Sequence, residues 1–354
     1  MTAPSLDAEP IDLAHVQSRI DQALHNFLDA KTRAARNRSL PLDVPTALRD
    51  FLDAGGKRLR PLLCVLGWHA AGGHGDDEAV IQTAAALEMF HAFCLIHDDI
   101  MDNSATRRGR PTVHRTLAVR HGHDQLGASA AILIGDMALA WSDELMHSAG
   151  HSPHRLTALR RIIDVMRQEV IYGQYLDLIT PLGPITDHQA ALRVIEFKTA
   201  KYTVERPLHC GATLADADPD LLTVLSRYAL PLGEAFQLRD DLLGVYGRPD
   251  DTGKPVLDDL REGKHTVLIA LAAQRADATQ RRLLDTLVGS PDLDLDGAAR
   301  IRTVLDATGA RATVEDMIAT RRAQALTALD AVPYPQPAAA ALGHIAARAV
   351  ERTS

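Results

Sequence analysis

Two pairs of adjacent aspartates, each at the end of an apolar helical pattern, point most directly to chemistry. Asp98 and Asp102 lie four residues apart, so a helix places both carboxylates on one face, where they repel by roughly 0.2–0.5 kcal/mol. Asp240 and Asp241 close a second pattern of the same kind. Mg²⁺ commonly takes one or two protein carboxylates together with substrate phosphates. The two clusters therefore predict a magnesium–diphosphate site, although a solvated acidic helix end would explain either cluster alone.

Two basic clusters alternate with these acidic ones along the chain. Residues 55–61 (GGKRLRP) combine two glycines, which let the backbone approach a ligand, with cations suited to phosphate oxygens. Residues 106–111 (TRRGRP) follow the first aspartate pair. A helix end with solvated cations would explain the first cluster, and salt bridges to Asp98 and Asp102 would explain the second. The alternation of acids and bases predicts a site for two diphosphates and several Mg²⁺ ions, which would make diphosphate a better leaving group.

The elements that position these residues are predicted to be helices. Apolar residues recur every three or four positions, as on an amphipathic helix face, in 11–32, 80–103, 125–147, 155–179, 188–202, 221–245, 265–287 and 312–330. A last helix is expected after the prolines at 333–337, and no alternating β-branched run predicts strands. We therefore predict an all-α chain, with a flexible N-terminus at 1–10 and one domain over 11–354. The polar stretch 247–263 is predicted to be a functional lid or a surface loop.

Composition narrows the possible partners and the location. The formal net charge of −8 argues against nucleic acid as a partner. The three cysteines have no CxxC spacing, which favours reduced thiols in the cytoplasm. The N-terminus does not resemble a signal peptide. Glu88, His91 and Asp136 interrupt the most apolar segments, so no membrane span is predicted.

From Gly55 to Thr266 the sequence closely resembles the trans-isoprenyl diphosphate synthases, the polyprenyl synthetase family. The resemblance rests on ordered motifs, namely GGKRLRP, HDDIMD, TRRGRP, GQYLD, FKTAKYT, FQLRDD and the TGKP…DDLREGK loop. It implies an all-α fold with helices around a deep central cavity, and a homodimer. It also implies head-to-tail condensation of isopentenyl diphosphate with an allylic diphosphate, by ionisation, condensation and deprotonation.

The resemblance assigns a role to each candidate site residue. Three Mg²⁺ ions would be held by the aspartates Asp98, Asp102 and Asp240, supported by Asp99 and Asp241. The allylic diphosphate would be bound by Arg107, Lys198, Lys254 and, on loop closure, Lys264. Isopentenyl diphosphate would be bound by Lys57, Arg60, His91 and Arg108. The residues near the developing cation would be Thr199 and Gln237.

Two positions bear on product length and on metal binding. In this family, residues one and two helical turns before the first aspartate motif form the cavity floor. Phe93 and Phe90 stand there, with the small Cys94 beside them, and this combination resembles geranylgeranyl (C20) synthases. Farnesyl diphosphate (C15) is the alternative product, and the alternative interpretation of the two rings is that they are ordinary core residues. Gly244 stands where the second motif often carries a third carboxylate; since Asp240 is the expected ligand, activity is expected to survive, and how tightly the third metal is held is left open.

Two other functions fit part of the pattern. A class I terpene cyclase shares the first aspartate motif and the helical fold, but it should carry an Asn/Ser/Glu metal triad in place of the Asp240–Asp241 pair. A non-catalytic regulatory subunit of a heteromeric prenyl synthase typically loses aspartates or basic motifs, and here only the carboxylate at Gly244 is missing. The sequence therefore favours an active prenyltransferase.

Overall fold

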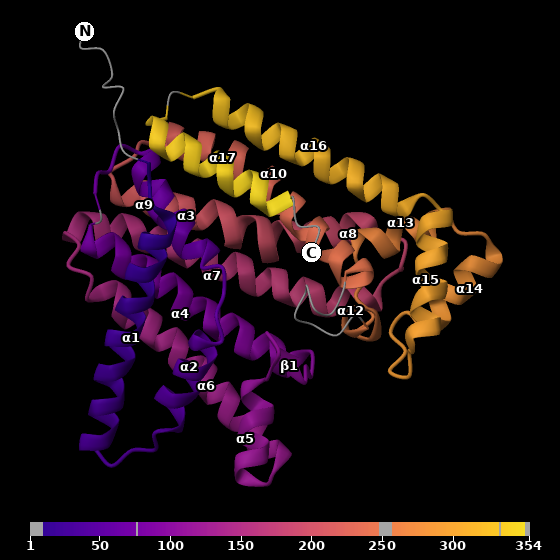
Figure 1. Ribbon diagram of the computed structural model, residues 1–354, viewed down its shortest axis with the longest axis horizontal. Coiled ribbons are helices and arrows are strands. Elements are labelled where there is room, and N and C mark those ends of the chain that lie inside the picture. Colours follow the sequence, from indigo (N-terminus) through magenta and orange to yellow (C-terminus); the bar gives the residue numbers. More distant parts are fainter. Residues whose placement is uncertain (1–9, 76, 248–256, 333, 351–354) are drawn as a thin grey trace. The chain divides into compact units, whose positions relative to one another are not determined.

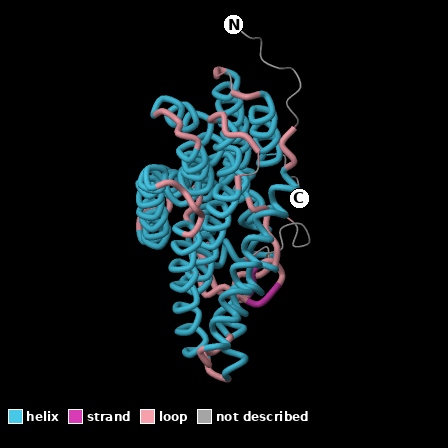
Figure 2. Tube along the Cα trace, turned by 90° about the vertical axis from the view of Figure 1, so that its left-hand side faces the viewer, coloured by secondary structure: helices cyan, strands magenta, loops and turns pink. Residues whose placement is uncertain are grey.

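The computed structural model describes residues 10–75, 77–247, 257–332 and 334–350, and nearly all of its regular structure is helical (Figures 1 and 2). Within these ranges the only strands are β1 (Thr106–Arg107) and β2 (Arg110–Pro111), which pair antiparallel in one short hairpin. The all-α prediction is confirmed. Internal contacts divide the chain into two compact units, which are described separately. The single domain over 11–354 stays a prediction.

The N-terminal unit comprises residues 11–159 and 210–216. Its complete helices are α1 (Leu13–Asn37), α2 (Asp43–Asp53), α3 (Leu59–Ala70), α4 (Glu78–Met101), α5 (Val113–His121) and α6 (Asp124–His147). It also holds the β1–β2 hairpin, the start of α7 (Pro153–Ile179) and the end of α9 (Arg206–Leu214). Helix α4 packs against α1, α3 and α6, so it forms the core of this unit.

Helix α4 carries the first aspartate motif at its end. It begins at the N-cap Asp77, whose carboxylate accepts hydrogen bonds from the backbone of Ala79 and Val80. Among the described helices, α4 alone is long and apolar enough to cross a membrane, but 67% of its most apolar window is buried inside the protein. Its apolar composition is therefore that of a core helix, which has to be apolar on most sides.

The C-terminal unit comprises residues 160–209 and 217–354, with Pro10. Its elements, after the rest of α7, are η1 (Thr180–Leu182), α8 (His188–Val194), the π-helix η2 (Ile195–Glu205), the start of α9, α10 (Pro219–Tyr246), α12 (Asp258–Arg261), α13 (Val267–Arg275), α14 (Ala278–Leu287), α15 (Leu295–Ala307), α16 (Ala310–Asp330) and α17 (Gln336–Val350). Helix α10 packs mainly against α16 and η2, and it ends in the second aspartate motif.

Two glycines bring neighbouring helices onto η2. A Cβ at Gly173 of α7 would lie 2.5 Å from the backbone nitrogen of Lys198, and one at Gly233 of α10 would lie 2.8 Å from the Cβ of Ala200. Only a residue without a side chain permits such close packing. The glycines therefore set the spacing of α7, η2 and α10, the three elements of this unit that carry Asp177, Lys198 and the second aspartate motif.

The predicted helices differ from the observed ones mainly at their ends. The predicted helix 265–287 is two helices, because Asp277 makes a capping box with Gln280 that starts α14. The short helices α2, α3, α5, α9 and α15 were not predicted. The C-terminal helix begins at Gln336, so Pro337 lies in its first turn, where its missing N–H costs no hydrogen bond. The predicted loop 247–263 contains the short helix α12 within its described part.

Candidate active site

Carboxylates gather at the C-terminal end of α4. Asp98 and Asp102 lie on one helix face as the spacing predicted; the side chain of Asp98 is 16% exposed, and that of Asp99 is 1% exposed. The C-terminal end of a helix is already partly negative, so these charges are unfavourable there unless cations neutralise them. The end of α4 is therefore an electrostatically demanding place that needs a cation.

Arg107 of the hairpin supplies one such cation. Its Nε donates a hydrogen bond of 2.7 Å to Asp99 Oδ1, and its guanidinium lies 3.4 Å from Asp98 Oδ2. Although burial lowers the pKa of Arg107, the hydrogen bond and charge of Asp99 raise it more. The sequence left open that residues 106–111 form salt bridges to Asp98 and Asp102. The structure shows such a salt bridge between Arg107 and Asp98. Asp102 is half-buried as the C-cap of α4.

The hairpin turn sends consecutive arginines to different partners. Arg108 and Gly109 form its two-residue loop, with φ of +52° and +71°, as a type I′ turn requires. The Arg108 guanidinium donates to the carbonyl of Gly55 and lies 5.8 Å over the Phe51 ring. Arg107 therefore forms ion pairs with Asp98 and Asp99, whereas Arg108 contacts the basic turn of residues 55–60.

Arg58 anchors that basic turn from inside. It is 6% exposed, and its guanidinium donates to Asp21, to Glu88 and to the carbonyl of Leu52 at 2.8–2.9 Å. Its φ of +47° is left-handed, a conformation that these contacts hold in place. Of the three cations in the turn, Arg58 is thus structural, whereas Lys57 is exposed and Arg60 is half-buried.

Arg60, His91 and Arg108 belong to one electropositive group. Arg60 lies 3.0 Å from Nε2 of His91. Burial lowers the pKa of His91 well below its usual value, and the charges of Arg60 and Arg108 lower it further. The imidazole is therefore neutral and can accept the hydrogen bond from Arg60. Burial also lowers the pKa of Arg108, and neighbouring guanidinium groups add to this effect while Glu88 opposes it. Such a group favours an anion.

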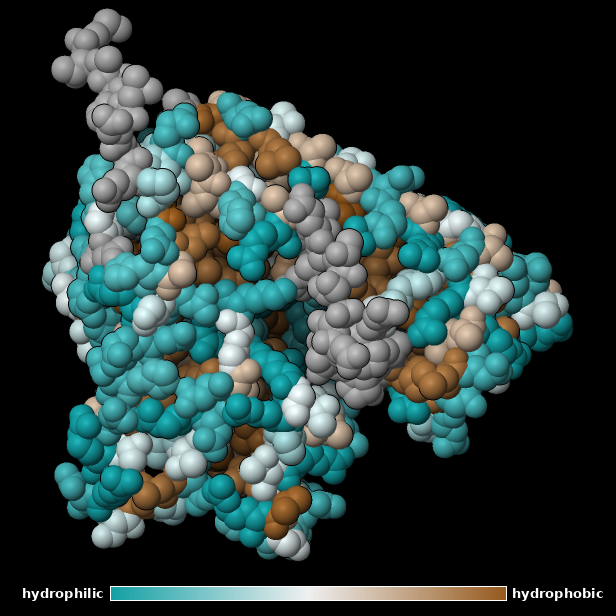
Figure 3. All heavy atoms as spheres, viewed as in Figure 1, coloured by the Kyte–Doolittle hydropathy of each residue, from teal (hydrophilic) through white to brown (hydrophobic). Residues whose placement is uncertain are grey.

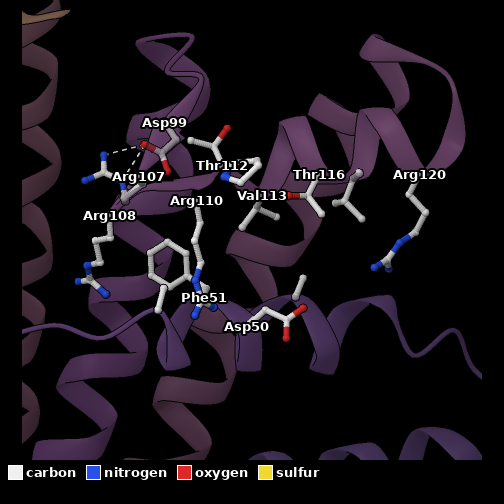
Figure 4. Close-up of a pocket in the computed structure, with 14 residues that line it drawn as sticks. Asp50, Phe51, Asp99, Arg107, Arg108, Arg110, Thr112, Val113, Thr116 and Arg120 are labelled. Atoms are coloured by element: carbon white, nitrogen blue, oxygen red, sulfur yellow. Dashed lines mark hydrogen bonds and ion pairs between the residues drawn. The ribbon is translucent and has the colours of Figure 1, made fainter. Parts of the chain in front are cut away.

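A cavity of about 240 Å³ adjoins this group (Figure 4). It is lined by α2, the hairpin and α5, and its charged lining residues are Asp50, Asp99, Arg107, Arg108, Arg110 and Arg120. In Figure 4, Arg107 lies against Asp99 and Arg108 lies near Phe51. The sequence did not predict this cavity, because α2 and α5 were not recognised as helices.

In the C-terminal unit, Lys198 and Thr199 of η2 lie among the partners of the second motif. Lys198 Nζ donates to Asp177 Oδ2 at 2.7 Å. Thr199 donates to Gln237 Oε1 at 2.7 Å, and the Gln237 amide donates to Asp241 at 2.9 Å. This chain of hydrogen bonds fixes which end of the Gln237 amide carries the oxygen. A π-helix is often found at a functional position, and η2 carries both residues.

Asp241 shows how strongly the second motif needs a positive charge. Burial raises the pKa of Asp241 to about 7; the Gln237 hydrogen bond opposes this, while Asp259, Asp240 and Asp177 add to it. Neighbouring carboxylates raise a pKa because their charges repel. Asp177 and Asp259 were not predicted as site residues. Asp177 could have been suggested only by its position three residues after Gln174, and Asp259 only by its position inside the DDLREGK motif.

The remaining predicted residues are placed only in part. Lys264 lies 2.7 Å from Glu262, and Lys254 lies outside the described residues. Phe90 is 2% exposed, while Phe93 and Cys94 are half-buried. The ring centroids of Phe90 and Phe93 are 5.3 Å apart, and Phe93 meets the His97 ring edge-on at 4.8 Å. Of the two rings, Phe93 is thus the one with surface to offer a ligand.

The carboxylates suit magnesium with a substrate phosphate. Over the described ranges, no three His, Cys, Asp or Glu side chains are grouped to hold a metal by protein ligands alone. Mg²⁺ needs fewer, since one or two carboxylates plus phosphate oxygens suffice. The raised pKa of Asp241 and the acidic end of α4 are both conditions that a hard cation would relieve. The residues present therefore fit Mg²⁺.

The helical fold and the paired aspartate and arginine clusters define a class of isoprenoid synthase, and the comparisons identify the family. The polyprenyl synthetase family pattern matches residues 43–304, so the chain belongs to that family and is a prenyltransferase. A solved geranylgeranyl pyrophosphate synthase from Corynebacterium glutamicum, complexed with isoprenyl diphosphate and magnesium, is 41% identical with a TM-score of 0.93, covering 97% of this chain and 100% of that one.

Characterised relatives carry different product names. A geranylfarnesyl diphosphate synthase of Aeropyrum pernix is 34% identical over 263 residues, which are 73% of this chain and 78% of that protein. A (2E,6E)-farnesyl diphosphate synthase of Mycobacterium tuberculosis is 33% identical over 300 residues, which are 84% of this chain and 80% of that protein. The family and the trans-prenyl diphosphate synthase class are therefore established, and the product length is not.

The buried ion pair of Arg58 predicts a large loss of stability when one partner is removed. Glu88→Gln should lower the free energy of unfolding by about 3 kcal/mol, because it removes the buried one of the two carboxylates that neutralise the Arg58 guanidinium. Glu78→Gln on the same helix is the control: Glu78 is 74% exposed, so its pair with Arg19 should be worth about 0–1 kcal/mol. Urea unfolding measures both, and equal losses would contradict a buried anchor.

The raised pKa of Asp241 predicts a pH-dependent stability. Because its folded pKa of about 7 exceeds the usual 3.8, the folded chain binds more protons and loses stability as pH rises between these values. In EDTA, Asp241→Asn should therefore raise the melting temperature more at pH 8 than at pH 5. The exposed Asp285→Asn should show no such trend. An equal increase in melting temperature at both pH values would contradict a raised pKa of Asp241 in the folded chain.

Proposed function

We propose that the chain joins isopentenyl diphosphate to allylic diphosphates and releases geranylgeranyl diphosphate, a C20 trans-prenyl diphosphate. The observation that carries this proposal is the pairing at the end of α4, where an aspartate cluster for metal lies beside Arg107 and the electropositive group of Arg60, His91 and Arg108. Such a site suits two diphosphates and a divalent cation together. The Corynebacterium glutamicum synthase, whose structure contains isoprenyl diphosphate and magnesium, supports the same chemistry.

In this proposal, the acidic residues hold three Mg²⁺ ions through Asp98, Asp102 and Asp240, with Asp99 and Asp241 supporting them. Bound magnesium supplies charge that stabilises the departing diphosphate. Arg107, Lys198, Lys254 and Lys264 bind the allylic diphosphate, and Lys57, Arg60, His91 and Arg108 bind isopentenyl diphosphate. Cations fixed in advance by ion pairs, as Arg107 and Lys198 are, spend little free energy on reorganisation when the leaving group becomes negative.

The allylic carbocation is stabilised by oxygens of the second motif. Thr199 donates its proton to Gln237, so the lone pairs of the Thr199 hydroxyl and the Gln237 carbonyl oxygen remain for a nearby positive charge. Asp241 holds the Gln237 amide in this orientation. The double bond of isopentenyl diphosphate attacks the cation, and a proton is then lost to the released diphosphate.

The product length rests on Phe93. Phe90 is buried beneath it, so Phe93 is the half-exposed ring that we propose as the floor of the prenyl cavity, with the small Cys94 beside it. One bulky residue with a small neighbour suits an intermediate length, C20. Because one of the relatives is a farnesyl diphosphate synthase, a C15 product is the alternative product length. Because Gly244 replaces a carboxylate, a non-catalytic regulatory subunit is the alternative function.

The first test is a product assay. The purified chain with Mg²⁺, labelled isopentenyl diphosphate and either dimethylallyl, geranyl or farnesyl diphosphate should release a C20 product, and Phe93→Ala should lengthen it because the floor is lowered. Phe27→Ala, which removes a ring that packs on Trp141, is the control and should leave the length unchanged. A C15 wild-type product would contradict the floor, and no product from folded protein would favour the regulatory subunit.

We also propose that the enzyme is a cytoplasmic homodimer joined through α6. Hydrophilic and apolar residues mix over the face drawn in Figure 3. Single exposed apolar residues are common on protein surfaces, so they do not identify an interface. On α6, however, the exposed apolar residues form a stripe, namely Leu126, Ile132, Leu133 and Met137. A second copy of the same helix would bury this stripe, since a two-fold interface pairs one patch with itself.

The dimer proposal predicts an oligomeric state that one charge can change. Leu133, 66% exposed, lies in the stripe, and Leu133→Asp should convert a dimer into a monomer because it would place a charge inside the interface. Leu295→Asp is the matched control: Leu295 is 70% exposed on α15 and should leave the dimer intact. Light scattering of both variants measures this, and a wild-type monomer would refute the proposal.

A further inference from the structure

The backbone of the turn at residues 55–60 needs support from outside the turn. Gly55, Gly56 and Arg58 have φ of +88°, +149° and +47°. Glycine takes such values freely, but a residue with a side chain does so only where its surroundings hold it. Lys57 lies inside this stretch, and Arg60 lies in the first turn of α3, of which Arg58 is the N-cap. The directions of the Lys57 and Arg60 side chains therefore depend on what holds Arg58.

Three helices hold the Arg58 side chain. Its Nε donates to Asp21 of α1 at 2.8 Å, and its two terminal nitrogens donate to Glu88 of α4 at 2.8 Å and to the carbonyl of Leu52 in α2 at 2.9 Å. A guanidinium presents its N–H groups in a rigid fork, so partners on several sides fix both its position and its orientation. The base of the turn is thus attached to α1, α2 and α4 together.

Helix α4 contacts the turn at two points. Glu88 and His91 are three residues apart, so they lie on one face of α4. Glu88 binds Arg58, and Nε2 of His91 lies 3.0 Å from Arg60. The Arg58–Glu88 pair is the inner contact, with side chains 6% and 5% exposed, whereas Arg60 and His91 are half-buried. The inner pair therefore helps to set where the outer pair lies.

Loss of a carboxylate at this place would have two effects of opposite sign on anion binding. Asp21 and Glu88 carry negative charge next to the electropositive group, so by charge alone their removal would strengthen the binding of a diphosphate. By geometry, their removal would release Arg58 and loosen the turn, and binding would weaken because the ligand would then have to order it. The sign of the change in affinity thus distinguishes the two roles.

Resting on the proposed function, we propose that Asp21 and Glu88 are positioning residues for isopentenyl diphosphate. By fixing Arg58, they hold the turn in the shape that directs Lys57 and Arg60 to the diphosphate. Asp21 belongs to α1, which ends before residue 43, where the match to the family pattern begins. The N-terminal helix therefore contributes to substrate affinity through Arg58, without contacting the substrate itself.

Binding of isopentenyl diphosphate in the absence of an allylic primer tests this role, because no turnover occurs. Asp21→Ala should weaken binding about tenfold, the loss expected when a hydrogen bond to a charged group is removed. Asp21→Asn keeps an oxygen that can accept from Arg58, so it should bind within about threefold of the wild type. Asp29→Ala is the control on the same helix: Asp29 is 55% exposed and pairs with Arg49, and its loss should leave binding unchanged.

A double variant separates positioning from stability. Arg58→Met combined with Glu88→Leu replaces a buried ion pair by apolar side chains, an exchange that is often neutral for stability. This variant should melt close to the wild-type temperature, yet its KM for isopentenyl diphosphate should be raised about tenfold while kcat and the KM for geranyl diphosphate stay unchanged.

Three results would overturn the positioning role. They are unchanged or tighter binding by Asp21→Ala, an equal loss of affinity for the allylic diphosphate, and a wild-type KM for isopentenyl diphosphate in the folded double variant. A folded wild type that binds isopentenyl diphosphate but releases no prenyl product would instead contradict the proposed function, and the binding measurements on Asp21→Ala would still decide the role of Asp21.

Discussion

Repulsion between carboxylates at two helix ends is the constraint on which the rest of the site depends. At the end of α4, the nearly inaccessible Asp99 and its neighbour Asp98 add negative charge where the helix is already negative. At the end of α10, burial raises the pKa of Asp241 to about 7, and the charges of the neighbouring carboxylates add to this effect. Folding tolerates neither arrangement without positive charge, so each unit brings cations to its own aspartates.

Arg107 and Lys198 neutralise some of the carboxylates that surround the two aspartate motifs. Arg107 binds tightly to Asp99 and more loosely to Asp98, at 2.7 and 3.4 Å, so Asp99 anchors the guanidinium while Asp98 can turn to a metal. Lys198 is held by Asp177 in the same manner. Each cation therefore has an acidic partner that fixes its position, and in the proposed function the same cation also binds the allylic diphosphate. If the proposed function holds, the same ion pairs that stabilise the folded chain also hold its cations in position for a diphosphate.

Local features of the site were predictable from the sequence, and those set by distant contacts were not. The shared face of Asp98 and Asp102 follows from helix geometry, and apolar periodicity located the long helices. Sequence alone treats the cations of the GGKRLRP turn alike, whereas Glu88, thirty residues away, makes Arg58 a buried anchor. Asp259 likewise reaches the second motif only through the packing of α12 on α10. The π-helical hydrogen bonding of η2 has no periodic signature that distinguishes it from an α-helix.

The left-handed backbone of Arg108 has a consequence for engineering this protein. The first residue of a type I′ turn is usually asparagine, aspartate or glycine, because other side chains strain the backbone there. A design procedure that selects for heat resistance would favour Arg108→Asn or Arg108→Gly, and would thereby delete a guanidinium from the electropositive group. Under the proposed function, a substitution at Arg108 that raises thermal stability would therefore lower the affinity for substrate. A library screened on melting temperature alone would then select variants of the hairpin that are stable but bind substrate weakly.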